Sequence, residues 1–449
     1  MIEMPSQTFD VQDFIDRQRL RPVHFGILAL CFLVMFVDGF DIYMVGKIAP
    51  AIAGDFGAAP AAITPVIVMQ QIGLAIGAFL MSPLGDRLGR KRMLLIAFAA
   101  FGLLTIATAF SPSIIVLATL RGITGLFLAA VLPYAVALIS EFTPLRQRAM
   151  FLSAGMAGYS LGNVAGSMTA LLVPDYGWEA GFVVGGAMPL ALLPVLALCL
   201  PESIAFRAAK DATDPVIART IRHLSPETAL TGDERFLVRT NQPGGRRANP
   251  LDLFLEGRGV ASTLLFAACF FSMGTITLVA AWMPSFFQQM GGISIQQFAR
   301  SAMIGLLGGI VGMLSIGALL DRVSRELPIP LFFLGYSAAI VVLGHVPFDS
   351  GWFTPALFVM AFFQGGGQAG LNMTMARVYP TRIRSTGIGW AGGAGRMGGV
   401  ILPLFGGYAL AQAFPLQLTL GVVAAFPFTV AVLVVFLGRA VRRTTSPSA

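Results

Sequence analysis

Charged side chains are scarce in this chain: Asp, Glu, Lys and Arg together make up 12% of its 449 residues. Soluble globular proteins carry about 25%. Hydrophobic residues reach 56%, and the mean hydropathy is +0.78. A chain with so few charges cannot cover its surface with groups that water solvates well. The composition therefore excludes a soluble globular protein and indicates an integral membrane protein.

Cysteine is also scarce. Cys31, Cys199 and Cys269 each stand alone in an apolar run, so we expect neither a disulfide framework nor a cysteine metal site. The net charge is +8, but the sequence shows no basic patch with interleaved aromatic residues, and we expect no nucleic acid partner. The first ten residues are acidic rather than basic, unlike a cleaved signal peptide.

Long apolar segments, in contrast, are abundant, and a membrane-spanning helix needs about 20 such residues. The first six spans are expected near residues 24–47, 62–83, 92–110, 113–137, 149–173 and 180–200. Six more are expected near residues 259–287, 297–319, 329–347, 354–377, 386–411 and 415–438. The sequence thus predicts an all-α membrane protein with twelve transmembrane helices in two six-helix bundles.

Lysine and arginine predict the orientation of these helices, because both are enriched in cytoplasmic loops. They gather in alternate loops, at Arg17, Arg19, Arg21, Arg87, Arg90, Lys91, Arg92, Arg146, Arg148, Arg322, Arg325, Arg382, Arg384, Arg439, Arg442 and Arg443. We therefore expect a multi-pass protein of the bacterial inner membrane with both termini in the cytoplasm. Its predicted parts are a cytoplasmic amino-terminal segment (1–23), an N-terminal bundle (24–200), a cytoplasmic central loop (201–258), a C-terminal bundle (259–438) and a cytoplasmic tail (439–449).

An internal repeat supports the division into two halves. The segment L-G-D-R-L-G-R at 84–90 is echoed by L-L-D-R-V-S-R at 319–325. Likewise, P-L-R-Q-R at 144–148 is echoed by P-T-R-I-R at 380–384, at nearly the same separation in the chain. Two similar helical halves around a central site are the layout of many secondary transporters.

These loop motifs resemble those of the major facilitator superfamily. S-P-L-G-D-R-L-G-R-K at 82–91 resembles its signature between the second and third spans, with Ser82 where glycine is usual. The segment from Arg121 to Gly125 resembles the arginine motif of its fourth span. The resemblance implies that charged residues at cytoplasmic helix ends form salt bridges that latch the outward-facing state. The matching residues here are Asp86, Arg87, Arg90, Asp321, Arg322 and Arg325.

A narrower resemblance is to the aromatic acid:proton symporter family. D-V-Q-D-F-I-D at 10–16 resembles the amino-terminal segment of that family, and D-G-F-D at 38–41 resembles its first-span acidic motif. The stretch 371–398 is similar to its tenth and eleventh spans. The fourth span departs from the family, with Phe127 and Tyr134 adding bulk. This departure leaves the identity of the substrate open.

Asp38 and Asp41 are the most unusual residues, because each charge at the centre of a membrane helix costs about 2.5–3.5 kcal/mol. Their spacing of three places both on one helix face, and Gly39 removes bulk between them. Two carboxylates so close cannot both be ionised cheaply, so one is expected to bind and release a proton during transport. The alternative is that Arg121, expected at a similar depth, holds both acids ionised as a structural ion pair. Arg121 is also a candidate substrate-binding residue.

Arg396 is the candidate for the substrate's carboxylate, because a guanidinium binds carboxylate through a planar fork. It lies near the middle of the eleventh span, and Gly389, Gly392, Gly393 and Gly399 share its face. These glycines leave room for a ligand. The alternative role for Arg396 is structural, as an ion pair with the first span or as a hydrogen-bond donor to backbone carbonyls.

Polar and aromatic side chains extend the candidate site. Gln364, Gln368 and Asn372 form a polar stripe on the tenth span that either hydrogen-bonds ring hydroxyls of a substrate or joins neighbouring helices. Aromatic substrates also need flat apolar walls. The candidates are Phe40, Tyr43, Phe127, Tyr134, Trp282 and Trp390, although many aromatic residues of such a chain face lipid or the protein core.

The expected function is proton-coupled import of an aromatic carboxylate by alternating access. The substrate is expected to resemble hydroxybenzoate, protocatechuate, vanillate or gallate, or to be a larger lignin-derived aryl acid. No enzymatic constellation, cofactor or ATP-binding loop is expected; the proton gradient supplies the energy. The partners are the small acid, protons and the lipid bilayer, and the protein is expected to act as a monomer. The alternative is a proton-antiport exporter of drugs or metabolites with the same fold.

Overall fold

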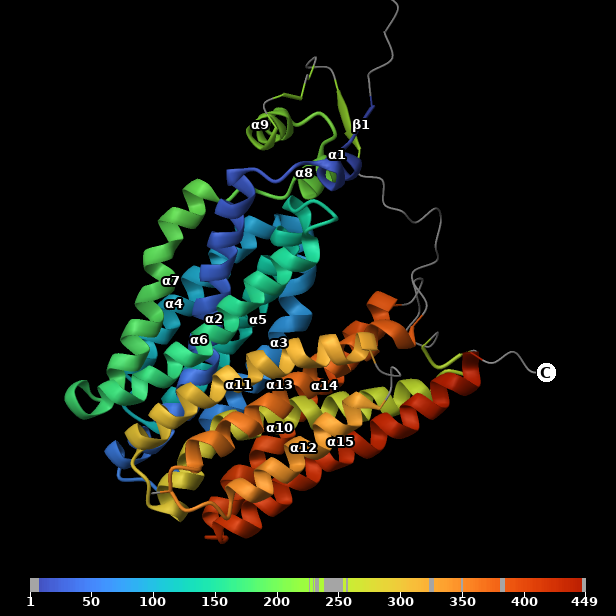
Figure 1. Ribbon diagram of the computed structural model, residues 1–449. Helices are drawn as coiled ribbons and strands as arrows, with labels where there is room; N and C mark the ends of the chain where they lie inside the picture. The colour runs from blue at the N-terminus through green and yellow to red at the C-terminus, as the bar shows by residue number, and fades with distance from the viewer. Residues whose placement is uncertain are drawn as a thin grey trace, which may run out of the picture.

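The computed structural model describes the chain except for residues 1–7, 226, 229, 231–233, 238–252, 256, 323–326, 349, 380–383 and 446–449. The described part is almost entirely α-helical, with one short pair of strands. Figure 1 shows its long helices gathered in two bundles. The predicted fold class, twelve long helices in two halves, is confirmed.

Six long helices form the N-terminal half. They are α2 (Pro22–Asp55), α3 (Thr64–Leu88), α4 (Arg90–Ala109), α5 (Ile114–Phe142), α6 (Arg148–Tyr176) and α7 (Glu179–Cys199), with a short 3₁₀ turn, η1 (Pro60–Ile63), before α3. Helix α2 begins with proline at its first position, where the missing N–H costs nothing. It runs eight residues past its expected end at residue 47 and stops just before Gly57, whose φ of +59° no helix accommodates.

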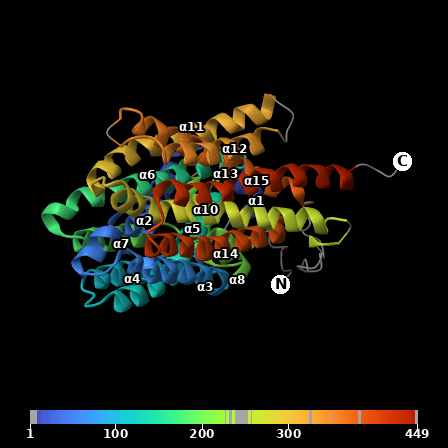
Figure 2. The ribbon, with the colours of Figure 1, turned by 90° about the horizontal axis from the view of Figure 1, so that it is seen from below.

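The C-terminal half repeats this arrangement. Its helices are α10 (Gly259–Gly291), α11 (Ile295–Arg322), α12 (Pro328–Leu343), α13 (Phe353–Val378), α14 (Arg384–Ala411) and α15 (Leu416–Thr445). In the N-terminal half α2 packs on α6, α3 on α5 and α4 on α7; in the C-terminal half α10 packs on α14, α11 on α13 and α12 on α15. Figure 2, seen from below, shows α10, α14 and α15 running side by side.

Most of these helices are apolar on every side, as membrane helices are. Eight helical segments of the described chain are long and apolar enough to span a membrane, and α12 is a shorter apolar helix. Helices α6, α13 and α14 are less apolar because they carry many glycines and polar residues. Glycine is used for close packing: at Gly162 the backbone of α2 approaches α6 so closely that a Cβ has no room.

A small unit covers one end of the N-terminal half. It consists of β1 (Thr8–Asp10), α1 (Val11–Arg17), α8 (Ile204–Lys210), α9 (Pro215–Leu224) and β2 (Arg235–Leu237). Strands β1 and β2 pair in parallel, with Phe9 opposite Phe236. Asp16 of α1 forms a 2.6 Å ion pair with Arg148 at the start of α6. The sequence did not predict that the amino-terminal segment and the central loop form one unit.

The two halves contact each other at the ends that lie farthest from this small unit. Gly46 of α2 lies against Ala281 of α10, and Thr64 of α3 lies against Gly407 of α14. Gln296 of α11 donates a hydrogen bond to a backbone carbonyl of α6. From these contacts the bundles diverge toward the side that carries α1, α8 and the end of α15 (Figure 1).

Candidate functional site

A buried ion pair joins α2 to α5 in the core of the N-terminal half. Asp41 and Arg121 are both 0% exposed. The guanidinium grips the carboxylate with two nitrogens, Nη2 to Oδ2 at 2.5 Å and Nη1 to Oδ1 at 3.1 Å. Thr105 of α4 donates its hydroxyl to Asp41 Oδ1 at 3.2 Å. Three helices are thereby tied together by one charged cluster.

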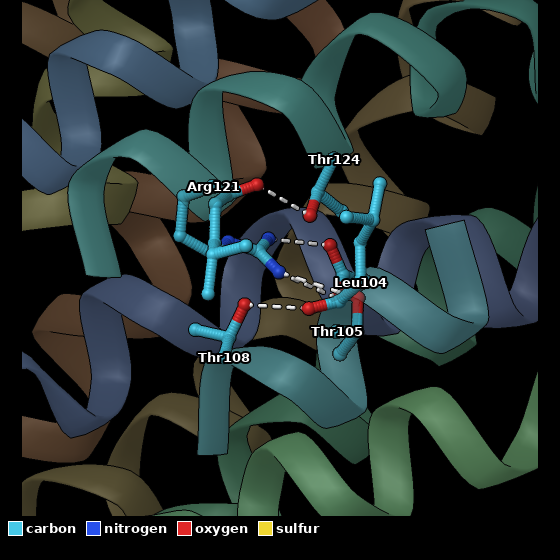
Figure 3. Close-up of polar contacts among 7 residues, drawn as sticks. Leu104, Thr105, Thr108, Arg121 and Thr124 are labelled. Carbon is cyan, nitrogen blue, oxygen red and sulfur yellow. Dashed lines mark hydrogen bonds and ion pairs between the residues drawn. The ribbon is translucent and has the colours of Figure 1, made fainter. Parts of the chain in front are cut away.

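The surroundings of Arg121 hold it in place. Its guanidinium carbon lies 5.6 Å from the centre of the Phe182 ring on α7, an arrangement in which the ring face attracts the cation. Figure 3 shows Arg121 with Thr105 beside it, whereas Thr108 and Thr124 bond to carbonyls one turn earlier in their own helices. Of the three guanidinium nitrogens of Arg121, only Nε lacks a hydrogen-bond partner among the described residues. Asp41 and Arg121 therefore form a fixed pair.

Asp38, one turn earlier on α2, has a different environment. It is buried, and its Oδ1 has no hydrogen-bond partner in the part of the chain that the structure describes. Its electrostatic neighbours are Asp41, Tyr43 and Tyr159. The two phenol oxygens lie 3.5 Å apart, and the two rings meet edge to face. Gly39 brings the α6 backbone close at this point.

Arg396 lies on the face of α14 that packs against α3 farther along the helix. Its side chain is exposed, and none of the ion pairs or hydrogen bonds found among the described residues includes it. Gly407, about three turns later and therefore on the same face of α14, packs on α3. A Cβ on Gly389 or Gly393 would meet nothing within 4 Å. The glycines thus leave open space around Arg396.

The polar stripe on α13 is partly engaged within the C-terminal half. Ser272 of α10 donates to Gln368 Oε1 at 2.6 Å, and Gln368 Nε2 donates to Asn372 Oδ1 at 2.9 Å. The first bond links α10 to α13, as the interhelical alternative predicts, and the second lies within α13. Gln364 is half-buried and Asn372 is exposed, so both remain accessible.

The candidate aromatic residues divide into core and accessible groups. Phe40 packs on α7 beside Gly185, and Tyr134 lies over α3 with its hydroxyl bonded to a backbone carbonyl. Tyr43 and Phe127 are half-buried, while Trp390 is 51% exposed. Trp282 is completely buried. Tyr43, Phe127 and Trp390 are therefore the candidates that keep exposed surface in this conformation.

The helix-end charges are described only in part. Arg90 at the start of α4 pairs with Glu141 at the end of α5 at 2.8 Å, and Arg87 is exposed. The side chains of Asp86, Asp321 and Arg322, and the whole of Arg325, lie outside the described part of the chain. The sequence did not single out Glu202, which accepts the N–H groups of Lys91 and Arg92 and so caps α4. Glu202 directly precedes Ser203, the N-cap of α8, and this position was the sequence feature that could have identified it as a residue at a helix end.

Two related six-helix bundles that meet at one end and enclose charged side chains define a secondary membrane transporter. Residues 31–395 match the family model of the Major Facilitator Superfamily. The chain belongs to this superfamily; it is a multi-pass membrane transporter and not an enzyme.

Curated relatives cover nearly the whole chain. A gallate transporter of Pseudomonas putida is 35% identical, covering 94% of each chain. The 4-hydroxybenzoate transporter PcaK of Pseudomonas putida is 31% identical, covering 88% of each chain. A 3-(3-hydroxy-phenyl)propionate transporter of Escherichia coli is also 31% identical, covering 89% of each chain.

A solved structure supports the fold. The bacterial homolog of the human lysosomal transporter Spinster, in an inward-facing and unoccupied conformation, has a TM-score of 0.72. The alignment covers 96% of this chain and 100% of that one, at 14% identity. At this identity the likeness concerns the fold alone.

Proposed function

We propose that the protein imports an aromatic carboxylate together with protons. The two halves would rock about their shared contacts and open the site to either side in turn. Relatives named as transporters of gallate and 4-hydroxybenzoate, over nearly the full length, support this substrate class. The proton gradient supplies the energy, without a cofactor, and the protein acts as a monomer in the bacterial inner membrane.

The observation that carries the proposal is Arg396. An exposed guanidinium with glycines around it, on the face of α14 that turns toward α3, suits a planar carboxylate. Trp390 on the same helix is exposed and offers a flat apolar surface. A cation at this position favours an anionic substrate over the cationic drugs that many exporters carry.

The orientation is part of the proposal. The small unit formed by β1, α1, α8, α9 and β2, together with the basic residues of the alternate loops, would lie in the cytoplasm. On this assignment the halves diverge toward the cytoplasm, so this conformation would be inward-facing.

Transport by the purified protein in sealed vesicles tests the proposal. With an outside medium more acidic than the lumen, labelled gallate or 4-hydroxybenzoate should accumulate, and an uncoupler should abolish the accumulation. Mock vesicles without protein are the control. If accumulation of the labelled aromatic acid were the same with and without the pH step, proton coupling would be contradicted. Efflux of a cationic drug driven by the same step, without uptake of acids, would favour the exporter instead.

A further inference from the structure

We propose that Asp38 alone carries the coupling proton, while Asp41 stays ionised as the permanent partner of Arg121. This assignment rests on the proposed function and divides between two residues a role that the sequence assigned to both. It follows from the different surroundings of two carboxylates that lie on the same face of α2.

Asp41 has every feature of a fixed anion. Both of its oxygens accept hydrogen bonds from Arg121, and Oδ1 also accepts one from Thr105. Charge-assisted bonds of this two-pronged kind are among the strongest in proteins. Protonating Asp41 would leave Arg121 buried among apolar helices without a counter-charge, which is strongly unfavourable. Arg121 therefore keeps Asp41 ionised through the cycle.

Asp38 lacks such a partner. None of the ion pairs of the described residues includes it, and its Oδ1 is buried without a donor. The groups that face it are one anion, Asp41, and two phenols, Tyr43 of α2 and Tyr159 of α6. A phenol can donate to the carboxylate or accept from the protonated acid. Neither phenol is hydrogen-bonded to Asp38 in this conformation, and no basic residue of the described chain pairs with it. Nothing there fixes Asp38 in its ionised form, as a proton carrier requires.

Charge balance explains how this carrier would couple the two fluxes. In the empty protein the negative Asp38 and the positive Arg396 balance, and Asp41 balances Arg121. In the loaded protein Asp38 has taken up one proton and the substrate carboxylate neutralises Arg396. A lone proton or a lone acid would leave one uncompensated charge in the closing site, which is costly in a medium of low dielectric constant. One proton therefore accompanies each monocarboxylate, with no net charge moved.

Two transport assays in vesicles separate the roles of the acids. The first measures accumulation of labelled acid after a pH step of one unit, which drives about tenfold accumulation at one proton per acid, since about 1.4 kcal/mol is a factor of ten. The second measures counterflow, the exchange of labelled for unlabelled acid at equal pH. Asp38→Asn should lose the accumulation and keep counterflow. Asp38→Glu should restore part of the accumulation.

Two further variants complete the comparison. Asp41→Asn should lose both activities together with thermal stability, because it breaks the buried pair. Asp211→Asn, which alters an exposed acid between α8 and α9, is the control and should match the wild type in both assays. An imposed membrane potential should leave wild-type accumulation unchanged.

Normal accumulation by Asp38→Asn, or loss of counterflow from a folded Asp38→Asn protein, would overturn the assignment. Should the asparagine variant not fold, Asp38→Ser takes its place. Infrared spectroscopy gives an answer that needs no substrate: as the pH falls, the wild type should show the C=O stretch of one protonated carboxylic acid that is missing from the spectrum of Asp38→Asn. A wild type that moves no aromatic acid, but shows this band, would refute the proposed function and leave the assignment standing.

Discussion

Arg396 and the Asp41–Arg121 pair show how one residue type takes two roles in one protein. Arg121 is fully buried, and its charge is neutralised by a carboxylate of its own half. Arg396 is exposed on a glycine-lined face that turns toward the other half. A guanidinium whose charge is already paired fixes the fold, whereas an unpaired one on an open face is suited to a ligand.

Replacing Arg396 by lysine should weaken uptake of the aromatic acid. The positive charge is kept, but the two-pronged geometry that matches a carboxylate is lost. We expect the KM for uptake to rise about tenfold or more, since loss of a charge-assisted hydrogen bond costs roughly 1.5–3 kcal/mol. Initial rates over a range of substrate concentrations measure the change. Unchanged affinity would mean that Arg396 has only a structural role.

Replacing Asp41 by asparagine should destabilise the protein. Removing one partner of a buried pair leaves the other charge uncompensated, at a cost of about 3–5 kcal/mol. Thermal unfolding in detergent, followed by size-exclusion chromatography, measures the loss. Asp38→Asn is the matched comparison, because Asp38 has no basic partner among the described residues, and it should unfold close to the wild-type temperature. Equal stability of the two variants would contradict the distinction drawn between the acids.

At the scale of helices, glycine residues allow the closest helix–helix contacts. Helices α2 and α6 pack in parallel, and Gly158, Gly162 and Gly166 of α6 lie against successive turns of α2. This contact also brings Tyr159 over Gly39, next to Asp38. Packing by small residues therefore builds the surroundings of the proposed proton carrier.

A leucine at Gly162 should separate α2 from α6. The backbone of Phe36 leaves no room for a side chain there, and overpacking costs about 1–3 kcal/mol or more. We expect lower yield, a lower unfolding temperature and loss of uptake. Gly421→Leu on α15 is the control, because a Cβ at Gly421 meets nothing within 4 Å. A folded and active Gly162→Leu protein would show that the two helices can move apart without consequence.

At the scale of the molecule, the described residues of the two halves meet near one end, so alternating access requires those contacts to separate. Thr64 and Gly407 belong to this contact, and a Cβ on Gly407 would lie 3.0 Å from that of Thr64. Disulfide-bonded cysteines have Cβ atoms about 3.5–4.5 Å apart, so a small shift allows a bond.

A cysteine pair at Thr64 and Gly407 should lock the halves together. With Cys31, Cys199 and Cys269 replaced by serine, oxidation of the pair should stop uptake, and a reducing agent should restore it. The Thr64→Cys single variant is the control and should be unaffected by oxidant. Full uptake by protein shown to be cross-linked would contradict a cycle in which this contact opens.

The class of the protein and most of its helices could be predicted from composition and local pattern. Apolar length is a local property, so the twelve spans could be predicted from the sequence, with errors of up to eight residues, as at the end of α2. The repeated loop motifs also predicted two similar halves. In the same way, Asp38, Asp41, Arg121 and Arg396 stood out, because charges inside apolar segments are costly wherever they lie.

The partners of those charges, in contrast, depend on how the helices pack. The sequence could not distinguish Asp38 from Asp41, because both lie on one helix face. In the structure Arg121 pairs with Asp41 alone, because α4, α5 and α7 converge on that side of α2. The pairing of β1 with β2 was equally invisible, since it joins residues more than two hundred positions apart. Partners of this kind depend on how distant segments pack, and a one-dimensional pattern carries no information about that distance.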